Sequence, residues 1–411
     1  MEQQCVGTEA ARVLHTGPLR EQVDGFVEGL HAQGYAAASI QEKLLFVAQL
    51  SHWLERRGLG LRALDEGRLR AFLRDRRRRY RAQRGAAATG VQLLRHLRTT
   101  GALPPAKVAA RHDKATEVEA GYAQYLREER GLAGATLVNY LPLVHRFLVA
   151  RFGKGRVRLA QLRAGDVTRF VLRQAPAMGP GRAKLLVTAL RSFLRFLHLR
   201  GETAANLTPA VPRVADWRLA TLPKFIPAED VQRLLRSCDR RTPTGRRDYA
   251  ILVVLARLGL RAGEVVQMTL DDLDWDVGEV IVRGKGSRHA RLPLPKDVGE
   301  ALVAYIRSDR PRCASRRVFL CARAPRRGFS SSVAICTIVR RAIGRAGLRT
   351  PTKGAHLLRH SLATDLLRRG ASLAEIGELL RHRSPDTTVL YAKVDVASLR
   401  EIALPWPGGA S

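Results

Sequence analysis

The chain has 411 residues, of which 45% are apolar, so composition favours a folded protein of two or three domains over a disordered tail. Lysine and arginine number 71 against 37 acidic residues, which gives a net charge of +34 and indicates an anionic partner. Nucleic acid is a much better candidate for this partner than a membrane surface. Five cysteines without a CxxC pair argue against a disulfide framework and against a structural zinc site. Because the sequence shows neither a leader pattern nor an apolar run long enough to span a membrane, we expect a cytoplasmic bacterial protein.

The first two hundred residues are predicted to form helices separated by glycine and proline. Apolar residues at helical spacing run through 39–58 and again through 136–153. The segment "LRALDEGRLRAFL" (61–73) parallels "LAQLRAGDVTRFVL" (159–172), and Gly101 corresponds to Gly201. We therefore predict two helical domains, 1–110 and 111–212, related as a duplication and followed by a proline-rich linker at 213–228. The alternative is chance, since two Leu- and Arg-rich helical bundles can align this well.

The pattern changes in the last domain, 229–411. The segments "EVIVRG" (279–284) and "HARLPLP" (289–295) are typical of strands, and "KGSR" is a tight connection between them. Helices are predicted on both sides of this hairpin, including 331–346, 355–369 and 372–381. The predicted fold class is mainly α with a small antiparallel sheet, an α+β domain that follows helical ones.

Four short segments of this domain carry charged or reactive side chains: Arg261 in "GLRAGEV", Lys285 in "RGKGSRH", His356 and Arg359 in "HLLRH", and His382 followed by Tyr391. Each has an ordinary explanation when taken alone, such as a surface arginine, a turn lysine or a core tyrosine with a bonded hydroxyl. His356 and His360 have the spacing of a zinc pair. However, Leu and Arg fill the position where a metalloprotease helix has its glutamate, which argues against a metal.

Together these residues suit phosphodiester transfer through a covalent tyrosine. Planar guanidinium groups can grip the oxygens of a doubly negative, pentacoordinate phosphorus. A lysine can protonate the leaving 5′ oxygen, and a histidine can take the proton of the attacking tyrosine. Because the phosphotyrosine link conserves the bond energy, neither a metal nor a nucleotide is required, and the sequence has no GxxxxGK[ST] motif.

In this order the segments resemble the tyrosine recombinase/integrase family, which includes phage integrases and Xer-type site-specific recombinases. The resemblance is carried by "GLRAGEV", "RGKGSRHARLPLP", "HLLRHSLATDLLRRG" and "IGELLRHRSPDTTVLYAKV". It is strong over 225–395 and weaker over 115–210. It implies a helical core-binding (SAM-like) domain at 111–212 and a catalytic domain with a C-terminal tail at 229–411. The extra domain at 1–110 would be a second core-binding-like module.

The resemblance also implies a role for each residue. Arg261 and Arg359 would clamp the scissile phosphate, Lys285 would protonate the 5′ oxygen, and His356 would act as the base. His382 would be a second phosphate donor, and Tyr391 would be the nucleophile that forms a 3′-phosphotyrosyl link. Glu264 would support the site without reacting.

The implied activity is site-specific DNA recombination or integration by an enzyme of a phage or mobile element, transposition included, without metal, ATP or another cofactor. The implied partners are double-stranded DNA and further copies of the chain or related recombinases, as a tetramer on two DNA sites, with no membrane. Two alternatives stay open: a type IB topoisomerase-like relaxing enzyme, and an accessory DNA-binding protein with an inactive recombinase fold.

Two features depart from the family pattern. The family usually has glycine directly before the histidine equivalent to His382, whereas this chain has Arg381, which bears on the local backbone shape. The amino-terminal stretch is also longer than in a minimal member. There, "RDRRRRYRAQR" (74–84) would be either a phosphate-contacting edge or a solvated charged face. The tail "VDVASLREIALPW" (394–406) would dock on a neighbouring subunit or on its own domain.

Overall fold

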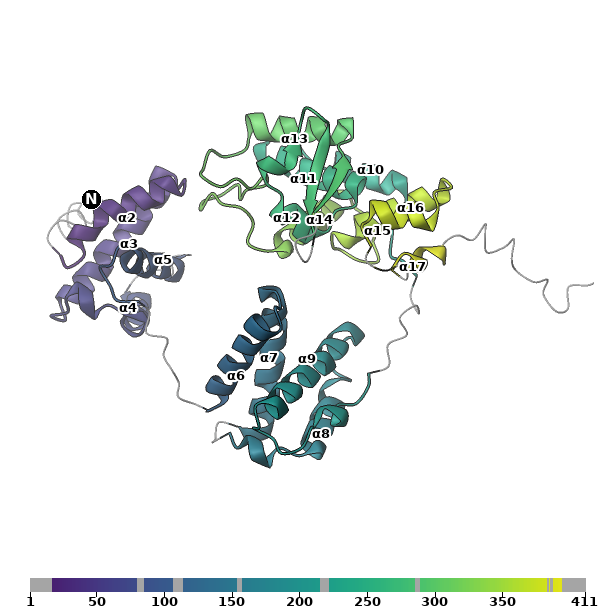
Figure 1. The fold of residues 1–411 in the computed structure, drawn as a ribbon. Coiled ribbons are helices and arrows are strands. Elements are labelled where there is room, and N and C mark those ends of the chain that lie inside the picture. Colours follow the sequence, from purple (N-terminus) through teal and green to yellow (C-terminus); the bar gives the residue numbers. More distant parts are fainter. Residues whose placement is uncertain are drawn as a thin grey trace, which may run out of the picture. The chain divides into compact units, whose positions relative to one another are not determined.

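The computed structural model describes residues 17–79, 85–105, 114–153, 157–214, 222–284, 289–382, 384 and 387–393 (Figure 1). By their contacts these residues divide into two compact units, one within 105–220 and the other comprising those within 1–104 and 221–411. Lys285, residues 80–84 of the arginine-rich run and the tail from 394 lie outside the described residues. None of the described helices is long and apolar enough to cross a membrane.

The amino-terminal module is a small helical bundle. Its elements are α2 (Arg20–Ala32), α3 (Ala37–Glu55), the 3₁₀ turn η1 (Leu61–Ala63), α4 (Glu66–Arg79) and α5 (Ala86–Thr99). Phe26, Phe46, Leu50 and Leu93 are among its core residues, each at most 2% exposed. The bundle therefore has a hydrophobic core of its own.

The second module is also helical. It contains α6 (Lys114–Gln124), the π-helical turn η2 (Tyr125–Glu129), α7 (Gly134–Phe152), the 3₁₀ turn η3 (Leu159–Gln161), α8 (Ala164–Gln174), α9 (Pro180–Leu199) and the 3₁₀ turn η4 (Thr208–Ala210). Its core is aromatic: Tyr122, Phe147 and Phe193 are each fully buried. Phe147 and Phe170 pack edge to face with their ring centroids 5.1 Å apart, which fixes α8 against α7.

The main elements of the two helical modules follow the same order: a helix, a 19-residue helix, a three-residue 3₁₀ turn and two further helices. The second module has η2 and η4 in addition. The 3₁₀ turns lie at Leu61–Ala63 and Leu159–Gln161, the positions that the sequence comparison paired. A glycine in the left-handed region follows the last α-helix of each module, Gly101 (φ 77°) after α5 and Gly201 (φ 69°) after α9. The correspondence thus extends from the sequence to the elements and to the turns that end them.

The third part contains the predicted sheet, in which β2 (Glu279–Arg283) lies antiparallel between β1 (Leu273–Asp274) and β3 (His289–Pro293). Ile281 pairs with Arg291, and Val280 and Val282 point into the core. The other elements are α10 (Ala228–Arg236), α11 (Pro243–Leu258), α12 (Ala262–Gln267), η5 (Leu270–Asp272), α13 (Lys296–Ser308), α14 (Ser332–Arg345), α15 (His356–Arg368), α16 (Leu373–Leu379) and α17 (Val389–Ala392). The predicted fold class, mainly α with a small antiparallel sheet, is confirmed.

Helix α11 is the centre of this part because it is apolar on nearly every side. Its residues 250–256 are all at most 5% exposed, and the helix packs against α13 and α15. It begins where the Thr242 hydroxyl accepts a hydrogen bond from the Gly245 N–H (3.0 Å), with Pro243 in its first turn. It ends at Gly259, whose φ of 57° suits glycine. The turn there leads directly into Arg261.

Candidate active site

Helix α15 supplies three of the site's side chains, because His356, Arg359 and His360 lie three and four residues apart on one face. Arg359 is only 4% exposed, and its two terminal nitrogens donate hydrogen bonds to the carbonyl groups of Gly259 and Leu380. Burial, followed by the nearby charges of Arg261 and Arg381, lowers the pKa of Arg359 to about 10. The guanidinium is still charged at neutral pH, and three of its five N–H donors remain for a ligand.

Arg261 occupies the N-cap position of α12 and is held there by Glu264. One carboxylate oxygen of Glu264 accepts the backbone N–H of Arg261 (2.8 Å), and the other lies 2.8 Å from its Nη1. Burial would raise the pKa of Glu264, but the Arg261 backbone N–H and the charges of Arg381 and Arg261 outweigh it, so this pKa lies below its ordinary value. The side chain of Arg261 is 40% exposed, whereas that of Glu264 is 7% exposed. The ion pair therefore leaves the guanidinium of Arg261 accessible.

Tyr391 lies on α17 and is 1% exposed. Its hydroxyl lies 2.8 Å from Nδ1 of His360, and its ring stacks on that of His382 with 6.3 Å between centroids. Burial raises the pKa of Tyr391 to about 12, although Arg359 and Arg261 act in the opposite direction. The tyrosine is therefore a neutral phenol whose proton must be removed before it can attack.

The histidines around Tyr391 are neutral at physiological pH. Burial, then the neighbouring His356 and Arg359, lowers the pKa of His360 to about 4, so its Nδ1 can accept the tyrosine proton in a hydrogen bond. Burial and nearby arginines, Arg359 first among them, likewise lower the pKa of His382 to about 4. Its Nδ1 lies 2.7 Å from the hydroxyl of Thr388, which leaves Nε2 for a ligand.

Five of the six predicted site residues are described, and they share one site: Arg261, His356, Arg359, His382 and Tyr391. His356 is exposed at the start of α15, and desolvation together with Arg359 and Arg261 lowers its pKa. Lys285, the sixth, lies outside the described residues. Two contacts were missed from the sequence: His360 against Tyr391, and Thr388 against His382. In the part of the chain that the structure describes, no group of three or more His, Cys, Asp or Glu side chains is arranged to hold a metal ion.

Comparison with known proteins agrees with the geometry. Residues 224–398 match the model of the phage integrase family. The chain is 46% identical to "Putative integrase/recombinase y4rA" of Sinorhizobium fredii over 395 residues, 96% of each chain. It is 32% identical to tyrosine recombinase XerD of Mycobacterium tuberculosis over 305 residues, which is 70% of this chain and 95% of that one. This chain belongs to the phage integrase family of tyrosine recombinases.

As a member of that family, this recombinase is a DNA strand-exchange enzyme, and the resemblance found in its motifs is confirmed. Solved structures agree on the fold. XerH bound to its difH substrate has a TM-score of 0.56 and 19% identity, over 70% of this chain and 96% of that one. A lambda integrase dimer bound to its core site has a TM-score of 0.52 and 18% identity, over 67% and 94%.

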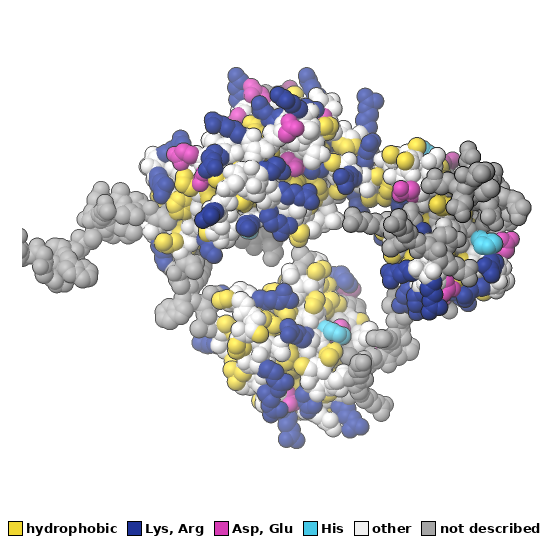
Figure 2. Space-filling view, turned by 180° about the vertical axis from the view of Figure 1, so that it is seen from behind, with side chains coloured by type: hydrophobic (Ala, Val, Ile, Leu, Met, Phe, Trp, Pro, Cys, Tyr) yellow, Lys and Arg dark blue, Asp and Glu magenta, His cyan; other side chains and the backbone are white. Residues whose placement is uncertain are grey.

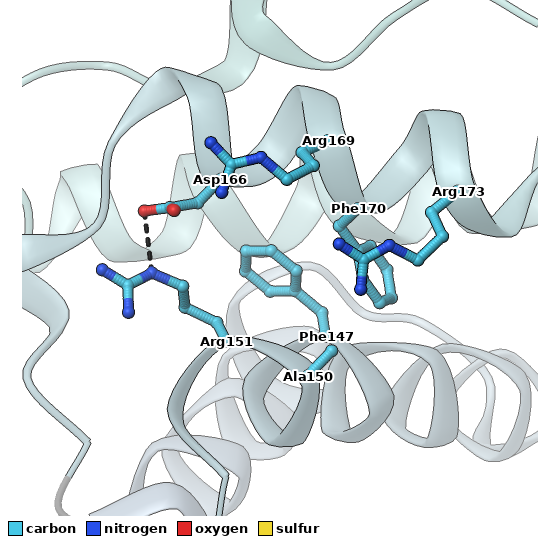
Figure 3. A pocket seen from close by; sticks show the side chains of 7 residues that line it. All are labelled: Phe147, Ala150, Arg151, Asp166, Arg169, Phe170 and Arg173. Carbon is cyan, nitrogen blue, oxygen red and sulfur yellow. Dashed lines mark ion pairs between the residues drawn. The ribbon is translucent and has the colours of Figure 1, made fainter.

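This recombinase has a second basic feature, a pocket between α7 and α8 in the second helical module (Figure 3). The pocket is lined by Phe147, Ala150, Arg151, Asp166, Arg169, Phe170 and Arg173. Nε of Arg151 lies 2.8 Å from the Asp166 carboxylate, whereas Arg169 and Arg173 are exposed about one turn apart on α8. Figure 2 shows Lys and Arg side chains, in dark blue, at many places on the visible face of the described residues. Arg169 and Arg173 are thus placed to meet an anion from solvent.

Proposed function

We propose that this recombinase cleaves and rejoins DNA at a specific site through a 3′-phosphotyrosyl link on Tyr391. The observation that carries the proposal is the position of the Tyr391 hydroxyl, which is hydrogen-bonded to a neutral histidine and lies in the field of Arg359 and Arg261. A buried phenol beside a base and two guanidinium groups has what a phosphoryl-transfer nucleophile requires.

The proposed first step exchanges one ester bond for another. The phenol oxygen of Tyr391 bonds to phosphorus, the bond from phosphorus to the 5′ oxygen breaks, and that oxygen takes a proton from Lys285. Arg261 and Arg359 stabilise the charge on the phosphate oxygens, and His382 donates a further hydrogen bond. The reverse step, with a different 5′ hydroxyl as nucleophile, rejoins the strand. The phenol proton passes to a histidine. Because one ester replaces another, no nucleotide is needed as an energy source, and because arginines supply the positive charge, we propose that no metal takes part.

His356 is the proposed base from the family pattern, and His360 is a second candidate for the same role. The distance favours His360, because its Nδ1 is 2.8 Å from the hydroxyl that must lose its proton. The exposure of His356 instead suits contact with the bound phosphate.

For partners, we propose double-stranded DNA and further copies of this chain, with four copies on two DNA sites. The support is by analogy: a lambda integrase tetramer bound to a Holliday junction shares the fold, with a TM-score of 0.51. Arg169 and Arg173 would contact backbone phosphates. We further propose that the recombinase acts in the cytoplasm on the DNA of a mobile element or phage.

We propose that residues 1–110 are a duplicate of the helical domain at 111–212, that 213–228 is a linker and that 229–411 is the catalytic domain. The shared order of elements supports the duplication.

In the first copy, Arg70, Arg74 and Arg77 are exposed and recur three or four residues apart, so they share one side of α4. We propose that this side contacts DNA phosphates. Replacing all three with glutamine is expected to reduce the salt dependence of DNA binding, whereas replacing the exposed Arg62 in η1 is a matched control.

The proposed activity is tested with a set of overlapping nicked DNA duplexes that covers both ends of the mobile element that carries the gene. Each duplex is mixed with the purified protein in the presence of a chelator. A covalent protein–DNA band on a denaturing gel is expected for the wild type and should disappear in Tyr391→Phe. Tyr249→Phe is the matched control, because Tyr249 is a partly buried tyrosine of the same domain. DNA binding without any covalent band would instead favour an inactive accessory protein.

A further inference from the structure

Arg381 occupies a position that normally suits glycine. It directly follows α16 and its C-cap residue Leu380, and its φ of 54° makes it the one described non-glycine residue in the left-handed region. The Arg381 N–H donates to the Glu378 carbonyl and the His382 N–H to the Gly377 carbonyl, both at 2.9 Å. This pair of bonds is the Schellman motif, in which the left-handed residue is usually glycine because a Cβ there is strained. The family's glycine at this position therefore has a backbone explanation, and arginine needs a different one.

The side chain of Arg381 is largely buried and contacts Glu264, the residue that holds Arg261. Its Nη2 lies 3.1 Å from the Glu264 carboxylate, and its Nη1 donates to the Leu379 carbonyl (2.9 Å). The side chains of Arg381 and Glu264 are 14% and 7% exposed. Glu264 is the residue that also holds Arg261, so one buried carboxylate lies between two guanidinium groups. The pair is shielded from solvent and is therefore little weakened by salt.

The turn at Arg381 also connects to the other site residues through its chain neighbours. The carbonyl of Leu380, directly before it, accepts a hydrogen bond from Arg359, and His382 follows directly after it. A displacement of this turn would therefore move a partner of Arg359 together with His382. A glycine would preserve the backbone of the turn but would leave Glu264 with Arg261 as its single described guanidinium partner.

We propose that Arg381 is a positioning residue that acts through Glu264 to hold Arg261 in place for the scissile phosphate. The inference rests on the proposed function. Arg381 does not itself need to touch DNA: it binds the Glu264 carboxylate, which in turn fixes both the backbone N–H and the guanidinium of Arg261. Its contribution to lowering the pKa of Glu264 agrees with this role.

The experiment measures the rate of covalent complex formation on a nicked duplex between pH 5.5 and 8.5. Arg381→Gly, which suits the backbone, is expected to slow the reaction by at least about tenfold at neutral pH, with DNA affinity nearly unchanged. The loss should grow as the pH falls, because Glu264 without Arg381 has a higher pKa and is protonated sooner. Arg381→Lys should restore part of the rate. Arg369→Gln is the matched control for removing one positive charge, since Arg369 is a largely exposed arginine of the same domain, paired with Asp365.

A double-mutant cycle with Glu264→Gln separates a positioning role from a general loss of charge. Once Glu264 is neutral, adding Arg381→Gly should change the rate by less than about twofold, because the contact through which Arg381 acts is already lost. Arg381→Gln repeats the measurement with a non-glycine residue, so the result does not depend on the folding of one variant. Independent, additive losses overturn the inference. A wild-type protein without a Tyr391-dependent adduct overturns the proposed function as well, whereas unimpaired cleavage by Arg381→Gly overturns this inference alone.

Discussion

Replacing His360 with asparagine separates two roles that the structure assigns to one imidazole. The Nδ1 of His360 lies 2.8 Å from the Tyr391 hydroxyl. In the tautomer that leaves Nδ1 unprotonated, this atom accepts the hydrogen bond of the hydroxyl and can take its proton during attack. The amide oxygen of asparagine reaches nearly the same place as Nδ1 and can still accept the hydrogen bond. It cannot take the proton, so His360→Asn preserves the position of the tyrosine and removes the base.

The expected loss of rate follows from the loss of the general base, and the expected loss of stability follows from the burial of the tyrosine. Removing a general base slows cleavage by roughly 10²–10⁴-fold, while the retained hydrogen bond keeps the loss of stability below about 1 kcal/mol. His360→Ala should in addition leave the hydroxyl of Tyr391, a 1% exposed residue, without a partner. An unpartnered buried hydroxyl costs about 1–3 kcal/mol of unfolding free energy. The two variants should therefore share a rate defect and differ in stability.

The assay is single-turnover formation of the covalent complex, with urea unfolding as the stability measurement and His356→Asn as the matched variant. The pKa of His360 is lowered to about 4 from an ordinary 6.5, so its neutral, proton-accepting form persists as the pH falls below 6.5. A base with this pKa leaves the wild-type rate nearly flat from about pH 5.5 to 7.5. Cleavage by His360→Asn within about threefold of wild type, combined with a large loss in His356→Asn, would refute proton transfer to His360.

Three further substitutions test the site and the DNA surface. Arg359→Lys should lower stability by about 1–3 kcal/mol in urea unfolding and abolish the covalent band, because one ammonium cannot serve both the Gly259 and Leu380 carbonyls and grip a phosphate. Gly259→Ala should lower the unfolding free energy by about 1–3 kcal/mol, because the left-handed φ of 57° disfavours a Cβ and that Cβ would lie 2.6 Å from Leu380 Cδ2. An unchanged midpoint of urea unfolding would contradict this. Arg173→Gln should reduce the salt slope of DNA binding by about one if Arg173 contacts a phosphate, and leave it unchanged otherwise.

The positions of several site residues follow from local sequence patterns. Gly259 is recognisable as the end of a buried helix, so Arg261 can be placed at the start of the next one. His356 and Arg359 are one turn apart on a single predicted helix, which fixes their common face without tertiary information. The strands on either side of "KGSR" are likewise evident from their apolar pattern.

Contacts between distant segments could not be predicted in this way. His360 was considered only as half of a zinc pair, because its true partner, Tyr391, lies 31 residues further along the chain. The buried face of α3 was also wrong in part. Helical spacing predicts a face of Leu44, Leu45, Ala48 and Trp53. Ala48 is indeed buried, but the other three are only half-buried, and Phe46 and Leu50 are buried in their place. This helix is apolar on several sides, so periodicity alone does not select the face that packs.

The charges of the site explain why a third arginine beside it matters. With pKa values of about 4, His360 and His382 carry no charge at neutral pH, so among the described groups around Tyr391 the positive charge comes from the arginines. Arg261, Arg359 and Arg381 with the single carboxylate of Glu264 leave two net positive charges, equal and opposite to the doubly negative phosphorus that forms during transfer. Glycine at 381 would halve that excess and release the carboxylate from one of its two guanidinium partners. Because Arg381 and Glu264 are shielded from solvent, the effect should be larger than that of removing an exposed arginine, and Arg381→Gly and Arg369→Gln compare the two cases.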